Sequence, residues 1–496
     1  MSPIVIAIDA GTTGVRSFAV DSASRPIGMV YREFTQHFPQ PGWVEHDPAE
    51  IWSAVRATLS ELVATFEPGT VVAAIGITNQ RETVVAWDRS TGQPLHRAIV
   101  WQDRRTSERC DALAAAGHLE LVRARTGLVL DPYFSGSKIE WLLHNTDIGS
   151  NPDLAVGTVD DWIVWNLTGE HVTDPSNASR TMLYDIVDQR WSEDLCALFG
   201  VPMAALGAVR PSSGRIGTVR REAELSTGLF GVPVSGILGD QQAALFGQAC
   251  TRPGMAKNTY GTGSFVLMSV GAVCPPPAEG LLTTVAWDLG RNGGVAYALE
   301  GAVFVTGAAI QWLRDGLGII SSAAEIGPLA AQVADTNGAY VVPAFTGLGS
   351  PWWDPYARGT IVGLTRGVGR AHLARAVVES IAFQVRVVVD RMSAVSGTPL
   401  AELRVDGGAS VMDLLLQIQA DQLGVPVSRP VITETTALGA AYAAGLAEGV
   451  WASAAEVGAA WREDRRFTGT TDRETADRQY GGWQRAVERS RGWARQ

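Results

Sequence analysis

Two short turns rich in glycine and threonine follow apolar runs, and their composition suits a phosphate. One turn is residues 9–14 (DAGTTG), the other is residues 261–263 (GTG), and Gly407-Gly408 forms a third of the same kind. Small residues let backbone N–H groups approach an anion, and a carboxylate such as Asp9 can hold a hydrated Mg²⁺. A single turn of this type is more often a plain hairpin, but the set favours a polyphosphate. The chain has no GxxxxGK[ST] segment, so we do not expect a P-loop to bind the phosphate.

Three apolar runs end at a carboxylate, and one of these carboxylates is placed to act as a base. Asp9, Asp240 and Asp406 each follow such a run, and Asp240 directly precedes the helix-like segment 241–246. Transfer of a phosphoryl group to an alcohol needs a carboxylate that accepts the hydroxyl proton. We therefore predict Asp240 as the general base, with a simple helix-capping role as the alternative.

A charged pair and several aromatic residues could hold a small polyol. Arg81-Glu82 lies in a polar stretch between apolar runs, where a guanidinium could donate a fork of hydrogen bonds to a diol and a carboxylate could accept them. Trp101, Tyr133 and Phe265 could cover the carbon face of the polyol. The alternatives are a surface ion pair for Arg81-Glu82 and ordinary core packing for the aromatic residues.

The elements that must position these residues alternate between strand and helix patterns. Residues 4–8, 15–20 and 71–78 have the composition of strands, and residues 48–65 have apolar positions at helical spacing. This mixture indicates an α/β fold. A chain of 496 residues exceeds what one core supports, so we expect two domains, 1–248 and 249–496, with a cleft between them.

Composition excludes several classes of partner. The 40 basic and 51 acidic residues give a formal charge of −11 without a clustered basic stripe, which argues against nucleic acid and anionic membranes. The four cysteines form no CxxC pair, and we expect them to be reduced thiols. The N-terminus lacks a signal-peptide pattern, and the longest uncharged stretch, 258–278, is interrupted by glycines and prolines. We therefore expect a cytoplasmic protein without a membrane span.

Several longer segments resemble the glycerol kinases of the carbohydrate-kinase superfamily, which share the actin and hexokinase fold. The resemblance runs through nearly the whole chain and is carried by 41–48 (PGWVEHDP), 76–83 (GITNQRET), Trp101-Gln102, 131–135 (DPYFS), 239–248 (GDQQAALFGQ) and 258–263 (NTYGTG). It implies two ribonuclease-H-like domains flanking a deep catalytic cleft. It also implies phosphorylation of glycerol by ATP to sn-glycerol 3-phosphate and ADP.

The resemblance further implies a role for individual residues. Asp240 would be the general base, and Mg²⁺ would lie near Asp9. The glycerol-binding residues would be Arg81, Glu82, Tyr133, Asp240 and Gln241, with Trp101 and Phe265 as apolar walls. The residues at nucleotide-contacting positions would be Thr12, Thr13, Gly14, Arg16, Thr262, Gly307, Gln311, Gly408 and Met412. Relatives in this family are often homodimers or homotetramers, and we expect the same here.

The sequence departs from the family pattern only where the nucleotide would bind. Glycerol kinases usually have Gln after the first acid and Ser-Ser after the two threonines, whereas this chain has Ala10, Gly14 and Val15; Met412 replaces an Asn on the adenine side. Losing a hydrogen bond to a charged phosphate costs about 1.5–3 kcal/mol, or roughly ten- to a hundredfold in affinity. We therefore predict weakened ATP binding or a relaxed base preference.

Two other functions fit the same residues. One is a kinase for another small polyol or sugar, such as erythritol, xylulose or dihydroxyacetone. The other is an actin-like switch that hydrolyses ATP to change partners, since the fold carries several functions. A switch does not need Arg81, Glu82, Trp101 and Tyr133 at one cleft, so glycerol-dependent ATP turnover would distinguish the kinase from it.

Overall fold

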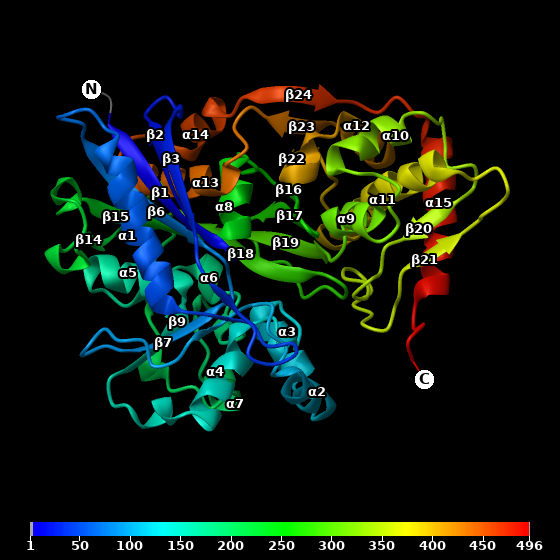
Figure 1. Ribbon diagram of the computed structural model, residues 1–496. Helices are drawn as coiled ribbons and strands as arrows, with labels where there is room; N and C mark the ends of the chain where they lie inside the picture. The colour runs from blue at the N-terminus through cyan, green and yellow to red at the C-terminus, as the bar shows by residue number, and fades with distance from the viewer. Residues whose placement is uncertain (1–2, 496) are drawn as a thin grey trace.

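The computed structural model describes residues 3–495 and contains two large mixed sheets (Figure 1). The first sheet has the order β14-β15-β6-β1-β2-β3, with β1, β6 and β15 parallel. Its strands are β1 (Ile4–Ala10), β2 (Gly14–Asp21), β3 (Pro26–Glu33), β6 (Val72–Asn79), β14 (Ser213–Thr218) and β15 (Pro233–Gly239). Because Asn79 pairs with both Ala10 and Gly239, the carboxyl ends of the three parallel strands meet at one edge. Ligands of open α/β sheets bind at such edges.

The second sheet repeats the pairing scheme of the first and adds one strand. Its order is β18-β19-β17-β16-β22-β23-β24, and β16, β22 and β23 are parallel, as β1, β6 and β15 are. Its strands are β16 (Met255–Tyr260), β17 (Ser264–Gly271), β18 (Leu282–Asp288), β19 (Val295–Val303), β22 (Glu402–Asp406), β23 (Val427–Pro430) and β24 (Glu463–Phe467). In each sheet a glycine- and threonine-containing turn joins the first strand to the second. The two predicted turns therefore occupy equivalent places.

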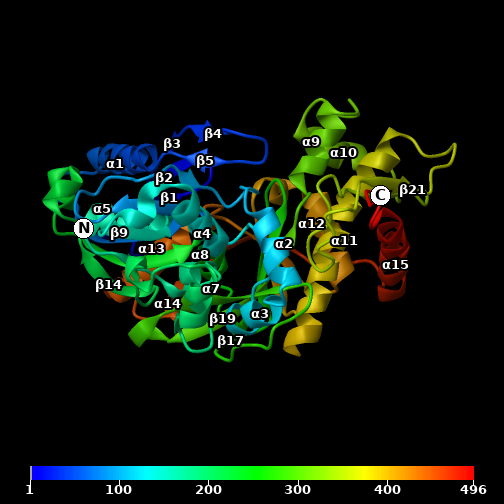
Figure 2. The ribbon, with the colours of Figure 1, turned by 90° about the horizontal axis from the view of Figure 1, so that it is seen from below.

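Helices cover both faces of each sheet. Apolar side chains from alternate positions of β1 pack against α1 (Pro48–Ala64) and α5 (Val159–Thr168). The second sheet packs against α11 (Arg370–Ser396) and α12 (Asp413–Leu423), and α9 (Gly307–Asp315) and α10 (Ile326–Ala330) pack on α11 in the same apolar cluster. A third buried cluster contains residues of both sheets together with α8 (Asp240–Gly247) and α13 (Thr435–Ala447). The sheets are thus joined through these two helices, as Figures 1 and 2 illustrate.

Helix α13 packs against the first sheet although it lies late in the sequence. The approach is close, since a Cβ atom added to Gly76 would lie 2.1 Å from the carbonyl oxygen of Ala440. Glycine is the residue that permits such backbone contact. The expected division into 1–248 and 249–496 therefore stays a prediction, because a segment of the second part helps to build the core of the first.

A smaller sheet and the remaining elements surround this core. The small sheet contains β4 (Gln36–His37), β5 (Glu45–His46), β7 (Val84–Asp88), β8 (Ala98–Ile99) and β9 (Leu154–Thr158), and near it lie α2 (Ser107–Ala115), α3 (Leu119–Thr126), α4 (Ser135–Asn145) and α7 (Glu193–Leu198). The others are β10 (Val172–Thr173), β11 (Tyr184–Asp185), β12 (Arg190–Trp191), β13 (Ala208–Val209), β20 (Tyr340–Val342), β21 (Thr360–Val362), α6 (Pro175–Ala178), α14 (Ala454–Ala460) and α15 (Arg473–Ser490). Within residues 3–495, none of the helices combines the length and apolar character needed to cross a membrane.

Candidate active site

The turns after β1 and β6 are tied together by hydrogen bonds. The Gly11 N–H donates to the Gly14 carbonyl over 3.0 Å and closes the first turn. Gln80, which follows β6, donates its backbone N–H to the Ala10 carbonyl over 2.8 Å and its side-chain amide to the Gly11 carbonyl over 3.0 Å. The polar stretch 79–82 is therefore held beside the first glycine- and threonine-containing turn.

Arg81 is buried and lies among acidic groups from distant parts of the chain. Its Nε is 3.1 Å from Asp240 Oδ1. Its Nη1 and Nη2 donate to the two carboxylate oxygens of Glu300 over 2.6 and 3.1 Å, and Nη2 also donates to the Tyr133 hydroxyl over 3.4 Å. The guanidinium fork that we expected to face a diol is thus engaged by Glu300 in a bidentate pair. What Arg81 offers toward the predicted site is its contact with Asp240 and with Tyr133.

Glu82 has a left-handed backbone conformation, with φ of 61°, and its side chain is buried. A non-glycine residue in this region is strained, and such strain is found where a side chain must be aimed precisely. Arg180 Nε donates to Glu82 Oε1 over 2.7 Å, and Arg81 Nε lies 3.8 Å from the same oxygen. Burial raises the pKa of Glu82 more than these two cations lower it.

Glu300 and Arg180 are buried neighbours of Arg81 and Glu82 that the sequence did not predict. Glu300 on β19 is fully buried and also accepts a hydrogen bond from Arg180 Nη2 over 2.9 Å. Burial alone would raise the pKa of Glu300, but the guanidiniums of Arg180 and Arg81 outweigh it and lower this pKa to about 2. A carboxylate within the otherwise uncharged strand 295–303 was a signal for this site, because a fully buried acid needs a partner.

Trp101 and Tyr133 lie edge to face, with ring centroids 5.6 Å apart. Trp101 Nε1 donates to Thr12 Oγ1 over 3.0 Å, so this predicted polyol wall contacts the predicted phosphate turn directly. Lys138 holds the segment that carries Tyr133, because its buried Nζ donates to the three consecutive carbonyls of residues 132–134. The 40 basic residues include only two lysines, Lys138 and Lys257, which marked both as unusual in the sequence.

Asp240 begins α8, and its side chain remains 30% exposed. Gly239 is the N-cap residue of this helix, and Asp240 Oδ1 accepts from the N–H of Gln241 over 2.7 Å. The same oxygen lies 3.1 Å from Arg81 Nε, a contact that a purely capping role does not explain. The buried Lys257 Nζ donates to the side-chain oxygen of Gln241, and burial lowers the pKa of Lys257 to about 8.

Phe265 lies on β17 and is partly buried against the cluster between the two sheets. It pairs with Ala302, and the next residue pair on the same face of the sheet is Leu267 with Glu300. Phe265 therefore shares a sheet face with the carboxylate that holds Arg81. Its expected contact with a polyol stays a prediction.

Asp9 lies opposite Arg16 in the β1–β2 pairing, and Asp9 Oδ2 is 3.6 Å from Arg16 Nη1. Burial raises the pKa of Asp9 to about 6; Arg16 lowers this pKa, and the charge of Asp240 raises it. Within residues 3–495 there is no group of three or more acidic, histidine or cysteine side chains that could hold a metal ion. A lone carboxylate of this kind suits Mg²⁺, which keeps several waters and binds substrate phosphates.

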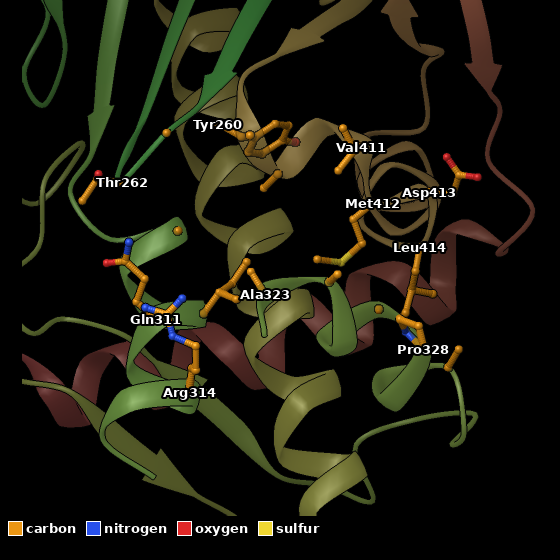
Figure 3. Close-up of a pocket in the computed structure, with 18 residues that line it drawn as sticks. Tyr260, Thr262, Gln311, Arg314, Ala323, Pro328, Val411, Met412, Asp413 and Leu414 are labelled. Atoms are coloured by element: carbon orange, nitrogen blue, oxygen red, sulfur yellow. The ribbon is translucent and has the colours of Figure 1, made fainter. Parts of the chain in front are cut away.

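A pocket of about 750 Å³ in the second domain contains the other predicted nucleotide residues (Figure 3). Thr262, Gly307, Gln311, Gly408 and Met412 all line it. The turns that carry them touch: the Gly307 N–H donates to the Gly261 carbonyl over 3.0 Å, and a Cβ atom added to Gly407 would lie 2.5 Å from the Tyr260 carbonyl oxygen. Apolar side chains such as those of Ile310 and Leu414 line the pocket beside these turns.

The four departures from the family pattern lie in different environments. Ala10 and Val15 are fully buried in the core beneath α1 and α5, where their side chains face away from Asp9 and Arg16. Gly14 and Met412 instead lie at the predicted phosphate turn and in the pocket. Met412 packs toward Gly327 on α10, since a Cβ atom added to Gly327 would lie 3.2 Å from Met412 Cγ. It provides an apolar surface where an amide would offer hydrogen bonds.

Comparison with known proteins agrees with this geometry. A glycerol kinase of Carboxydothermus hydrogenoformans is 54% identical over 99% of this chain and 98% of its own length, and one of Dechloromonas aromatica gives the same values. The crystal structure of Plasmodium falciparum glycerol kinase with ADP matches with a TM-score of 0.93 at 33% identity, covering 99% of this chain and 98% of the other. Xylulose kinase from Rhodospirillum rubrum matches with a TM-score of 0.87 at 28% identity, covering 97% and 98%.

Family models match almost the whole chain in two pieces. Residues 4–247 match the N-terminal domain of the FGGY family of carbohydrate kinases, and residues 256–448 match its C-terminal domain. These matches and the solved structures confirm the predicted α/β class with two actin/hexokinase-type domains. The chain belongs to the FGGY family of carbohydrate kinases.

Proposed function

We propose that this protein is a glycerol kinase, which transfers the γ-phosphoryl group of ATP to a terminal hydroxyl of glycerol and releases sn-glycerol 3-phosphate and ADP. One observation carries the proposal: Asp240 Oδ1 lies 3.1 Å from Arg81 Nε at the sheet edge that also carries the turn after β1. A partly exposed carboxylate is thereby placed beside both the predicted polyol residues and the predicted phosphate turn. The glycerol kinases that are 54% identical to this chain support the choice of substrate.

In this mechanism Asp240 accepts the proton of the attacking hydroxyl. The hydroxyl oxygen forms a bond to the γ-phosphorus while the bond from that phosphorus to the bridging oxygen breaks, and ADP leaves with the electron pair. Arg81 fixes the orientation of the Asp240 carboxylate through its Nε. The bidentate pair between Arg81 and Glu300 in turn fixes the guanidinium, so a buried ion pair holds the residue that orients the base.

The polyol would lie among groups that each offer a different contact. Glu82 and Tyr133 present a carboxylate and a phenol hydroxyl, and Gln241 presents a side-chain amide from the first turn of α8. Trp101 and Phe265 would cover the carbon chain. Because Trp101 also donates to Thr12, the wall of the polyol site and the phosphate turn are positioned together.

The nucleotide would extend from the two glycine- and threonine-containing turns into the 750 Å³ pocket. Its phosphates would contact Thr12, Thr13 and Arg16 on one side and Thr262 on the other. The nucleoside part would lie along Gln311, Gly408 and Met412. Mg²⁺ bound with ATP would neutralise charge on the transferring group. Asp9 is the residue that would hold this ion.

A coupled assay that follows ADP release tests the proposal. We expect ATP consumption to depend on glycerol, with glycerol giving the highest kcat/KM among glycerol, erythritol, xylulose and dihydroxyacetone. If glycerol were the poorest substrate of this panel, the protein would be a kinase for another polyol or sugar. ATP hydrolysis at a similar rate without any polyol would instead indicate a nucleotide-driven switch.

A further inference from the structure

Tyr31 occupies the space beside Gly14, at the point where the phosphate turn departs from the family pattern. A Cβ atom added to Gly14 would lie 2.7 Å from both Cζ and Oη of Tyr31, and 2.4 Å from the Arg32 carbonyl oxygen. Both distances are far shorter than a real Cβ contact. The phenol of Tyr31 therefore fills the position into which a side chain at residue 14 would extend.

The Tyr31 hydroxyl also contacts the turn itself. Its Oη is 3.1 Å from Thr13 Oγ1, within hydrogen-bonding distance. Each of these hydroxyls carries one proton and can both donate and accept. A single bond between them uses one proton, so the other O–H remains free to donate to an acceptor outside the pair. The pair thus presents one unused donor next to the turn.

The strand register places Tyr31 in a row of polar residues. Asp9 pairs with Arg16 across β1 and β2, and Arg16 pairs with Tyr31 across β2 and β3, so the three side chains lie on one face of the sheet. The Arg16 guanidinium carbon is 5.9 Å from the centre of the Tyr31 ring. Tyr31 is 44% exposed, so its hydroxyl is accessible to a ligand that also reaches Arg16.

We propose that the Tyr31 hydroxyl, held against Thr13, donates a hydrogen bond to a phosphate oxygen of the bound nucleotide and thereby replaces the hydroxyl that Gly14 lacks. The proposal rests on the proposed function, because it assumes that the turn 11–14 binds the phosphates of ATP. It changes the expectation drawn from the sequence at this turn. In this arrangement the Thr13 hydroxyl donates to Tyr31, and the Tyr31 hydroxyl provides the donor that position 14 lacks.

The test is Tyr31→Phe, which keeps the ring and removes only the hydroxyl. Binding of ADP and of adenosine is measured by calorimetry, together with the KM values for ATP and glycerol. We expect the Kd for ADP and the KM for ATP to rise about ten- to a hundredfold, the usual cost of a lost hydrogen bond to a charged group. Adenosine binding and the glycerol KM should not change. A loss of general packing would weaken adenosine and ADP alike.

Met29→Leu is the matched control. Met29 lies two residues earlier on β3, so it shares the face of Tyr31, and it is 50% exposed. This variant should bind ADP as the wild type does. If Tyr31→Phe binds ADP with wild-type affinity while the wild type phosphorylates glycerol, the role of Tyr31 is refuted and the proposed function stands. If the wild type binds neither ADP nor ATP, the proposed function and the role of Tyr31 both fail.

Discussion

Glu300→Gln is the substitution for which the structure gives the clearest expected magnitude. The amide has nearly the shape of the carboxylate, so the change removes a charge and leaves the packing in place. Arg81 and Arg180, both buried, then lose the carboxylate that they share. The amide nitrogen also turns one acceptor into a donor that faces a guanidinium, so the bidentate pair with Arg81 cannot form.

The size of the effect follows from the pKa of Glu300. Lowering this pKa from its ordinary value of 4.5 to about 2 corresponds to about 3 kcal/mol of folding free energy. This value agrees with the cost of removing one partner of a buried ion pair, which is about 3–5 kcal/mol. Because the pKa is lower in the folded state, the stabilisation is fully present above pH 4.5 and is lost as the pH falls toward 2. The difference between variant and wild type should therefore shrink in acid.

Urea-induced unfolding at pH 7, followed by tryptophan fluorescence, measures this change. We expect the free energy of unfolding to fall by about 3 kcal/mol. The glycerol KM should rise, because the released Arg81 no longer holds the hydroxyl of Tyr133, a predicted polyol residue. Glu61→Gln is the control, because Glu61 forms an ion pair with Arg32 on the surface and such pairs contribute about 0–1 kcal/mol. Unchanged stability and an unchanged glycerol KM in Glu300→Gln would refute the proposal that Glu300 holds the Arg81 guanidinium in place.

Three further substitutions test other parts of the structure. Asp240→Asn should lower kcat by about two to four orders of magnitude with little effect on glycerol binding, and an unchanged kcat would remove Asp240 from the role of base. Met412→Asn should lower the KM for ATP about tenfold relative to that for GTP, which steady-state kinetics with both nucleotides would detect. Burial and the charge of Asp160 raise the pKa of Asp161, so its carboxylate destabilises the fold increasingly as the pH rises above about 4. Asp161→Asn should therefore raise the melting temperature at pH 8 and hardly change it at pH 4.

The sequence predicts best the residues whose role follows from their immediate neighbours. The turns at Gly11 and Gly261 and the carboxylate of Asp240 each follow a strand, and the strand register brings the first turn and Asp240 to one edge. The partner of Arg81 could not be predicted in this way. Glu300 lies 219 positions away, and only the folded arrangement of two sheets brings these side chains into contact.

The similarity of the two large sheets also could not be predicted from the sequence. The two large sheets share a pairing scheme, yet their sequences show no short repeat, because a sheet fixes the alternation of buried positions and leaves the individual side chains free to vary. The packing of α13 against the first sheet also could not be predicted from the sequence. It depends on backbone contacts at glycines such as Gly76, and a glycine alone does not tell which distant segment will approach it.

Helix α8 connects the two halves of the site. Its first residue is Asp240, and Gln248, directly after its last turn, donates to the Asp406 carboxylate over 2.9 Å. Asp406 ends β22 and precedes the Gly407-Gly408 turn at the pocket, while Thr435 at the start of α13 donates to the same carboxylate. Eight helical residues span about 12 Å, so a short helix separates the predicted base from Gln248, which contacts Asp406 just before the predicted nucleotide turn. Asp406, which ends a strand, therefore links α8, β22 and α13, and we expect it to help position the predicted base Asp240.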